Sequence, residues 1–517
     1  MRDAAIYTAP PAGIEPLPYG YSEGAMPLVD YLERSPYLPL PFIVPVVLCG
    51  LSWMVEVPAL TDLGFAALTS ICAAVLISEI VQFPRRFGVG GIMLFGGALI
   101  WFCYDYMTVW FGIDYTDATI PFKPATVAKA AFFYSLFVML AAVGISIRGG
   151  RWFEKIFRVL PDPRWPNMYW WLFLAIFAFG ISPYFLFARG PFYTAIWNEL
   201  MGHGVSWTVG RSGNLNYNWG GYVGNIIEIG QISGILATVY AILVPGSLVK
   251  KLFAWAVWFF WVVYAYNGGR RGPLLAITAP PAALLFIKHQ AYAVEMFRRF
   301  SVRAYVYAGL LLFGTLVAIQ VQGYYRNRNL RDIDLGAVPL TDLRGNSMFS
   351  EALLGFEMIP DRRGYFMNRF PGEGAIRTIP DVVLRFFIHP IPRALWNNKP
   401  VDPVWAWYNE LVTGEATAGT TVASGLVGWF YMRFGVAGVI EGALLWGWLA
   451  RRAERGLQYA EGQPLRVMLS LGFLVWMFRC FRDLHFVELY PLVLATIVLW
   501  VVLKVFGVGV SRQMEEN

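Results

Sequence analysis

Residues 126–147 read TVAKAAFFYSLFVMLAAVGISI, and Lys129 is the only charged side chain among them. A helix that spans a bilayer needs about 20 mostly apolar residues. The chain contains about twelve stretches of this kind, which predicts an all-α polytopic membrane protein. The expected spans are residues 40–55, 63–83, 89–110, 126–147, 168–188, 221–244, 252–266, 273–288, 304–321, 425–450, 465–481 and 490–508.

The composition supports this class. Of the 517 residues, 57% are hydrophobic and 15% are charged, whereas an ordinary soluble domain has about 25% charged residues. A net charge of +7 would suit a nucleic-acid-binding protein. The lysines and arginines, however, gather in short connections between apolar runs, where they orient a membrane protein. We therefore expect membrane lipids, and no nucleic acid, as partners.

Positive charge divides the connections into two alternating sets. The more basic set marks the cytoplasmic side, which places residues 1–38 and the tail 509–517 in the cytoplasm of a bacterial cell, with the protein in its inner membrane. Residues 39–321 then hold the first nine expected spans, and residues 425–508 hold the last three. The basic set is Arg85, Arg86, Arg148, Arg151, Lys155, Arg158, Arg164, Lys250, Lys251, Arg298, Arg299, Arg303, Arg451, Arg452 and Arg455.

Residues 322–424 form the longest connection, and it falls on the opposite, periplasmic side. Loops of this length are usually functional or disordered, and the tryptophans Trp396, Trp405 and Trp407 favour order. Residues 347–359 and 380–388 have the pattern of amphipathic helices that lie along a membrane surface. We expect this loop to cover a site at the outer membrane face.

Cations on that face predict recognition of a diphosphate. Arg270 and Arg271 lie on a glycine-flanked turn, where their guanidinium groups could bind phosphate oxygens in pairs; anchoring to lipid headgroups is the alternative. Arg393 and Lys399 lie in a proline-rich stretch with His389. Ionisable groups close to the bilayer are functional candidates by default, which adds Arg479, Arg482, Asp483 and His485.

Three residues are candidates for the catalytic base. His389 comes first because histidine exchanges a proton near neutral pH, although an isolated loop histidine is often merely solvated. Asp483 and His485 compete for the same role.

Amide and aromatic side chains before and within the span 221–244 suggest a glycan surface. Asn214, Asn216 and Trp219 could contact sugars, or could belong to an ordinary glycine-rich turn. Asn225, Glu228 and Gln231 share one helix face, which points either to a cavity or to hydrogen bonds between helices. Trp396 of the large loop is a further candidate for contact with sugar.

No metal or other cofactor is expected. Asp332 and Asp334 match a two-aspartate metal motif, but Arg326, Arg328 and Arg331 surround them and would neutralise them. No P-loop, zincin or hydrolase-elbow pattern is present. Cys49, Cys72, Cys103 and Cys480 lie in apolar segments without ligand-like spacing, so we expect them to be packing residues.

Three motifs together resemble a known family. Arg270-Arg271-Gly272 precedes a helix, Ile391-Pro392-Arg393-Ala-Leu-Trp396 and Lys399-Pro400 lie in the large loop, and Phe430-Tyr431-Met-Arg-Phe434-Gly435-Val-Ala-Gly438 follows it. This order resembles the Wzy-type O-antigen polymerases, also called oligosaccharide repeat unit polymerases, over roughly residues 265–450. Trp429 stands where many members carry an acidic residue, so a role for that acid does not carry over.

The resemblance implies a membrane glycosyltransferase with an architecture similar to that of the GT-C transferases. Its substrates would be oligosaccharides linked to undecaprenyl diphosphate, and its product an O-antigen or exopolysaccharide. A chain-length regulator protein is a partner that the resemblance allows. The alternatives are an O-antigen ligase, which uses the same donor and another acceptor, and a transporter or flippase, whose polar helices would recur in matching halves.

Overall fold

The computed structural model describes the helical part of the chain. The described residues are 38–81, 88–103, 123–147, 166–201, 220–267, 271–298, 425–458, 464–482, 484 and 489–505, with the single positions Phe356, Phe387, Ile391 and Trp396. Within these residues the secondary structure is helical and includes no strand. The expectation of an all-α protein is therefore confirmed for this part of the chain.

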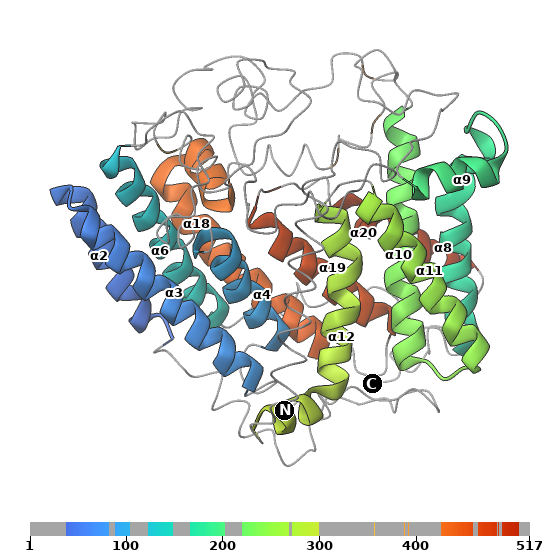
Figure 1. Ribbon diagram of the computed structural model, residues 1–517, viewed down its shortest axis with the longest axis horizontal. Coiled ribbons are helices and arrows are strands. Elements are labelled where there is room, and N and C mark those ends of the chain that lie inside the picture. Colours follow the sequence, from blue (N-terminus) through green and yellow to red (C-terminus); the bar gives the residue numbers. More distant parts are fainter. Residues whose placement is uncertain are drawn as a thin grey trace, which may run out of the picture.

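The helices match the expected spans. Each of those spans coincides with a helix over its described residues, except 304–321, which lies outside them (Figure 1). The span expected at 89–110 is described as far as Cys103. The helices are η1 (Leu40–Phe42), α2 (Ile43–Val55), α3 (Pro58–Val81), α4 (Gly88–Ala98), η2 (Leu99–Cys103), α6 (Pro124–Ser146), α8 (Pro166–Leu186), α10 (Gly220–Leu243), α11 (Leu248–Asn267), α12 (Arg271–Arg298), α18 (Gly425–Gln458), α19 (Pro464–Cys480) and α20 (Tyr490–Val505). One helix that was not expected, α9 (Phe192–Leu200), lies in the connection after α8.

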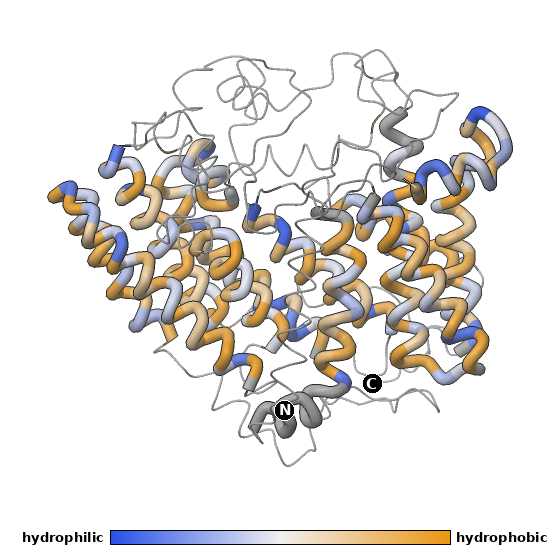
Figure 2. The backbone as a smooth tube through the Cα atoms, viewed as in Figure 1, coloured by the Kyte–Doolittle hydropathy of each residue, from blue (hydrophilic) through white to orange (hydrophobic). Residues whose placement is uncertain are grey.

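Among the described residues, five helices are long and apolar enough to cross a membrane: those over residues 58–80, 124–146, 167–186, 226–243 and 248–266. The residues 40–55, 88–103, 274–288 and 490–504 form shorter apolar helices. Figure 2 shows apolar residues along the length of these helices and polar ones gathered towards their ends. A membrane protein is the class that these lengths and compositions support.

Successive spanning helices from α2 to α12 run in alternating directions, whereas α6 and α18 run parallel to each other. The described basic residues Lys250, Lys251, Arg451, Arg452 and Arg455 lie at one end of the bundle. There, Arg452 of α18 donates to the carbonyl of Ile147, which follows α6, and Lys250 of α11 donates to Asn167 of α8. We call this the basic end. The other end, where α6 and α18 begin and α19 ends, is called the loop end because residues 322–424 lead into α18.

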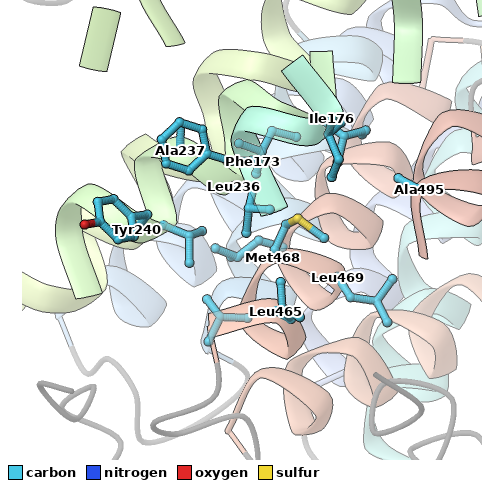
Figure 3. Close-up of a cluster of buried hydrophobic side chains, with 14 of the residues drawn as sticks. Phe173, Ile176, Leu236, Ala237, Tyr240, Leu465, Met468, Leu469 and Ala495 are labelled. Atoms are coloured by element: carbon cyan, nitrogen blue, oxygen red, sulfur yellow. The ribbon is translucent and has the colours of Figure 1, made fainter. Parts of the chain in front are cut away.

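Two apolar clusters form the core. One packs α2, α3, α4 and α6 against α18 as far as Ala450. The other packs α8, α10, α11, α12, α20 and the last turns of α18 around α19. The first half of α19 belongs to the second cluster: Figure 3 shows its Leu465 and Met468 beside Leu236 of α10. Its last turns, with Trp476 and Cys480, belong to the first cluster. Helix α19 therefore joins the two halves of the molecule.

Glycines allow the closest helix crossings. An added Cβ on Gly447 of α18 would collide with the carbonyl of Ala141 in α6. On the other side of the molecule, a Cβ on Gly230 of α10 would lie 2.5 Å from the Cα of Gly180 in α8. Without water as a driving force between helices, such small residues let backbones pack closely in a membrane.

Prolines inside two helices are compensated by hydrogen bonds from side chains. A proline leaves the carbonyl four residues earlier without its helical partner. Ser182 donates to the carbonyl of Phe179, the one that Pro183 frees, at 2.7 Å. Trp258 of α11 donates to the carbonyl of Ile277 at 3.1 Å, the one that Pro281 frees in α12. These bonds matter because lipid cannot supply a donor.

Candidate functional site

The beginning of α18 adjoins the end of α19. The backbone N–H of Leu426 donates to the carbonyl of Phe481 at 3.1 Å, next to Gly425, whose positive φ of 69° starts the helix. Arg479 lies in the last turn of α19, and Arg482 closes the turn after it by donating its backbone N–H to the Arg479 carbonyl at 3.0 Å. Two of the predicted diphosphate ligands therefore border the start of α18 at the loop end.

Arg433 is a buried cation two turns further along α18. Its side chain is only 2% exposed, and its guanidinium carbon lies 4.4 Å from the ring centroid of Trp429. A guanidinium over an indole face is a favourable cation–π contact. The ring also fixes the plane of the guanidinium, which is the group best suited to binding phosphate in pairs of hydrogen bonds.

A break in α18 follows Arg433 directly. Gly435 has φ 64° and ψ −149°, a non-helical conformation that divides α18 into two segments. This region of conformational space is essentially restricted to glycine. Because of this break, the segment that carries Trp429 and Arg433 ends at the position of the cation rather than continuing straight through the bundle.

Lys129 of α6 brings a second cation to the loop end. Its ammonium group lies 4.7 Å from the ring centroid of Tyr431 in α18 and donates to the carbonyl of Phe356 at 3.1 Å. Phe356 belongs to the large connection, and its buried ring stacks on Phe133 of α6 and lies 5.1 Å from the Tyr431 ring. A residue of the 322–424 connection is thus inserted between α6 and α18, next to a lysine.

Lys129 and Arg433 were not among the site residues expected from the sequence. Both could have been found by the rule that selected Arg479, since each is an ionisable residue in or beside an apolar span. Arg433 lies inside the Phe430–Gly438 motif, whose aromatic residues and glycines are its most distinctive members. Lys129 lies near the start of a span, where a lysine commonly extends to the membrane interface, so no functional role was predicted for it.

The other predicted site residues are described only in part. Glu228 lies on α10 and is half-buried, one turn before the buried Gln231, and Trp396 is exposed. Arg271 begins α12, of which only the backbone is described at that point. His389, Asp483, His485, Arg270, Arg393, Lys399, Asn214, Asn216 and Trp219 lie outside the described residues.

The basic end of α18 differs from the sequence-based expectation. Arg451 and Arg452 were expected in a connection after residue 450, but α18 continues to Gln458 and buries both side chains together with Glu454. Glu454 accepts a hydrogen bond from the backbone N–H of Gly90 in α4 at 2.9 Å. Helix α18 extends further because these polar groups find partners between α4 and α6, and burial of charge is tolerated only with such partners.

No group of acidic, histidine and cysteine residues suited to a metal occurs in the described part of the chain. The four cysteines are free and buried, as expected for packing residues.

The chain was compared with known proteins in three ways. No family model matches it, and neither a curated protein nor a solved structure matches it. Functional assignment therefore depends on the residues themselves.

Proposed function

We propose that this chain is a polysaccharide polymerase of the bacterial inner membrane. It would join oligosaccharides carried on undecaprenyl diphosphate at the periplasmic face, in a GT-C-like architecture and without a metal. The observation that carries the proposal is the buried, ring-stacked Arg433 at the loop end, on a helix whose start adjoins Arg479 and Arg482. The order of motifs that resembles the Wzy-type polymerases supports the same assignment.

The reaction requires stabilisation of a leaving diphosphate. A hydroxyl of the incoming lipid-linked unit attacks the anomeric carbon of the growing glycan. The bond from that carbon to the phosphate oxygen breaks, the hydroxyl proton passes to a base, and the lipid diphosphate departs. Fixed cations at the position where this negative charge develops lower the barrier without a metal.

The cations divide by position. Arg433 and Lys129 lie within the helices at the loop end, and Arg479 and Arg482 lie at its border. We assign diphosphate binding to Arg433, Arg479 and Arg482, together with the predicted ligands Arg270, Arg271, Arg393 and Lys399. His389, Asp483 and His485 remain the candidates for the base, and Asn214, Asn216, Trp219, Glu228 and Trp396 the candidates for glycan contact.

Reconstitution with a lipid-linked oligosaccharide tests the proposal. Purified protein in liposomes receives the undecaprenyl-diphosphate repeat unit of its own organism, without nucleotide or metal, and the products are separated by length. We expect a ladder of longer glycans. We expect Arg433→Ala, Arg270→Ala and Arg393→Ala to abolish it, since loss of one such electrostatic contact costs about 10²–10³-fold in rate.

Arg452→Ala is the matched control, because it removes an equally buried arginine from the same helix at the other end. Its ladder should persist per mole of folded protein. Glycan transfer only after addition of a lipid A core acceptor would instead indicate a ligase. A substrate-dependent proton current that Glu228→Gln abolishes, with no transfer, would indicate a transporter. Equal loss of activity in Arg433→Ala and Arg452→Ala would remove Arg433 from the site.

A further inference from the structure

Helix α9 presents aromatic side chains away from the bundle at the loop end. It is nine residues long, and Ala195 and Ile196 face the core formed by α8 and α11. Tyr193 and Trp197 are one turn apart and are 65% and 60% exposed. Figure 1 shows α9 at the upper right of the view, beside the ends of the spans.

This exposed surface continues the apolar outer face of α8. Trp171, Phe179, Phe185 and Leu186 are exposed on α8, a helix long and apolar enough to span a membrane. Such a row of exposed apolar side chains on a spanning helix faces lipid. Phe185 at the end of the row stacks on Phe192 of α9, with ring centroids 4.2 Å apart, so α8 and α9 share one aromatic surface.

The residue types on this surface suit the end of a spanning helix, which is where α9 lies. Tyrosine and tryptophan concentrate where acyl chains meet headgroups, because their rings are apolar and their polar atoms can reach water. Arg189, between the two helices, is exposed as well, and an arginine at that level can pair with lipid phosphate.

We infer that α9 is an interfacial helix. Its Tyr193 and Trp197 lie at the boundary of acyl chains and headgroups of the membrane phospholipids, with Arg189 at the phosphate level. The occupant of this surface is phospholipid, because the surface is continuous with the apolar face that α8 presents to the bilayer. This inference does not depend on the proposed polymerase activity.

Spin labels measure the depth of this helix. Tyr193→Cys and Trp197→Cys are prepared separately in the full-length chain, labelled, and reconstituted in liposomes of phosphatidylethanolamine and phosphatidylglycerol. The unmodified chain, whose four cysteines are buried, gives the background. Collisions with oxygen report a lipid environment, and collisions with a water-soluble nickel chelate report water.

We expect oxygen to exceed the nickel chelate at residues 193 and 197. The opposite order is expected in Asn198→Cys, a partly exposed polar position that lies about 100° around the helix from Trp197. An excess of nickel at Tyr193 and Trp197 would overturn the inference, since the surface would then face water. Low collision rates with both reagents would also overturn it, because protein or glycan would then cover the surface. The same oxygen excess at Asn198 would contradict the assignment of a single lipid-facing side.

Discussion

The two ends of α18 both bury an arginine, but in different surroundings. At the basic end, Arg452 is fully buried and donates to the carbonyl of Ile147 at the end of α6. Two residues later, Glu454 accepts from the backbone of α4. At the loop end, Arg433 is equally buried, and its guanidinium carbon lies 4.4 Å from the ring centroid of Trp429, one turn earlier in its own helix. Arg452 lies over Trp448 in the same way, at 5.5 Å.

The location of each arginine, rather than its ring contact, separates a structural role from a candidate functional one. Arg452 and Glu454 bind backbone groups of neighbouring helices, so their polar atoms hold the bundle together. Arg433 lies on a ring beside a helix break, near the connection that inserts Phe356. Burial of a charge over an aromatic ring therefore does not by itself identify a site, and the position of the charge in the molecule is more informative.

The largest effect on both ends of α18 is expected from a substitution where α18 crosses α6. A leucine at Gly447 would overlap the carbonyl of Ala141, and overpacking of this kind commonly costs about 1–3 kcal/mol or more. Since separation of the helices disturbs both ends, we expect Gly447→Leu to give the largest loss of folded protein. Size-exclusion yield and thermal unfolding in detergent measure it.

Gly224→Leu is the control for that substitution. A Cβ on Gly224 of α10 meets nothing within 4 Å, so this variant should fold with nearly normal yield. If both leucine variants lost the same amount of folded protein, close packing at Gly447 would not explain the effect.

Glu454 tests the structural role of the basic end. Glu454→Ala leaves the N–H of Gly90 without its acceptor in a buried place, which costs about 1–3 kcal/mol of unfolding free energy. Glu454→Gln keeps an acceptor oxygen and should lose less. Titration with denaturing detergent compares the two variants. Equal losses would show that the hydrogen bond is not the stabilising element, and a loss of catalytic rate per folded molecule would contradict a purely structural role.

Gly435 tests whether the helix break positions Arg433. Its backbone angles are strained for any residue with a side chain, at about 1–3 kcal/mol, so Gly435→Ala should straighten or destabilise α18 locally. We expect a fall in the rate of glycan transfer that exceeds the fall in melting temperature. Gly224→Ala serves as the comparison, and a normal transfer rate in Gly435→Ala would show that the break has no part in the site.

Lys129 gives the smallest expected change. Lys129→Met keeps most of the apolar side chain and removes the hydrogen bond to the Phe356 carbonyl, a contribution of about 0.5–1.5 kcal/mol, or up to about 3 when the donor is charged. We expect a small decrease in melting temperature. We also expect residue 356 to leave its position between α6 and α18 more often. The rate at which a water-soluble maleimide labels Phe356→Cys, with and without Lys129→Met, measures how often residue 356 is exposed to water. Unchanged labelling would show that Lys129 does not hold the connection in place.

Some helix bounds and residue positions could be predicted from the sequence alone, and others could not. The helices at 126–147 and 168–188 were predicted closely because unbroken apolar runs leave the backbone no partner except itself. The end of α18 was predicted too early, since Arg451 and Arg452 look like loop residues until α4 and α6 surround them. Arg479 and Arg482 lie at the end of α19, where the sequence placed them. The contact of Lys129 with Tyr431 could not be predicted, because it joins two helices that are far apart in the sequence.

The sequence by itself determined that this is a helical membrane protein, where most of its spans lie, and which connections are basic. These properties follow from local composition, because in lipid each helix satisfies its own backbone. The tertiary structure decided which charges are buried and against what. Lys129 meets Phe356 from 227 residues away, and Glu454 meets Gly90 from 364 residues away. No local pattern encodes such pairs, since they depend on how small residues let particular helices approach one another.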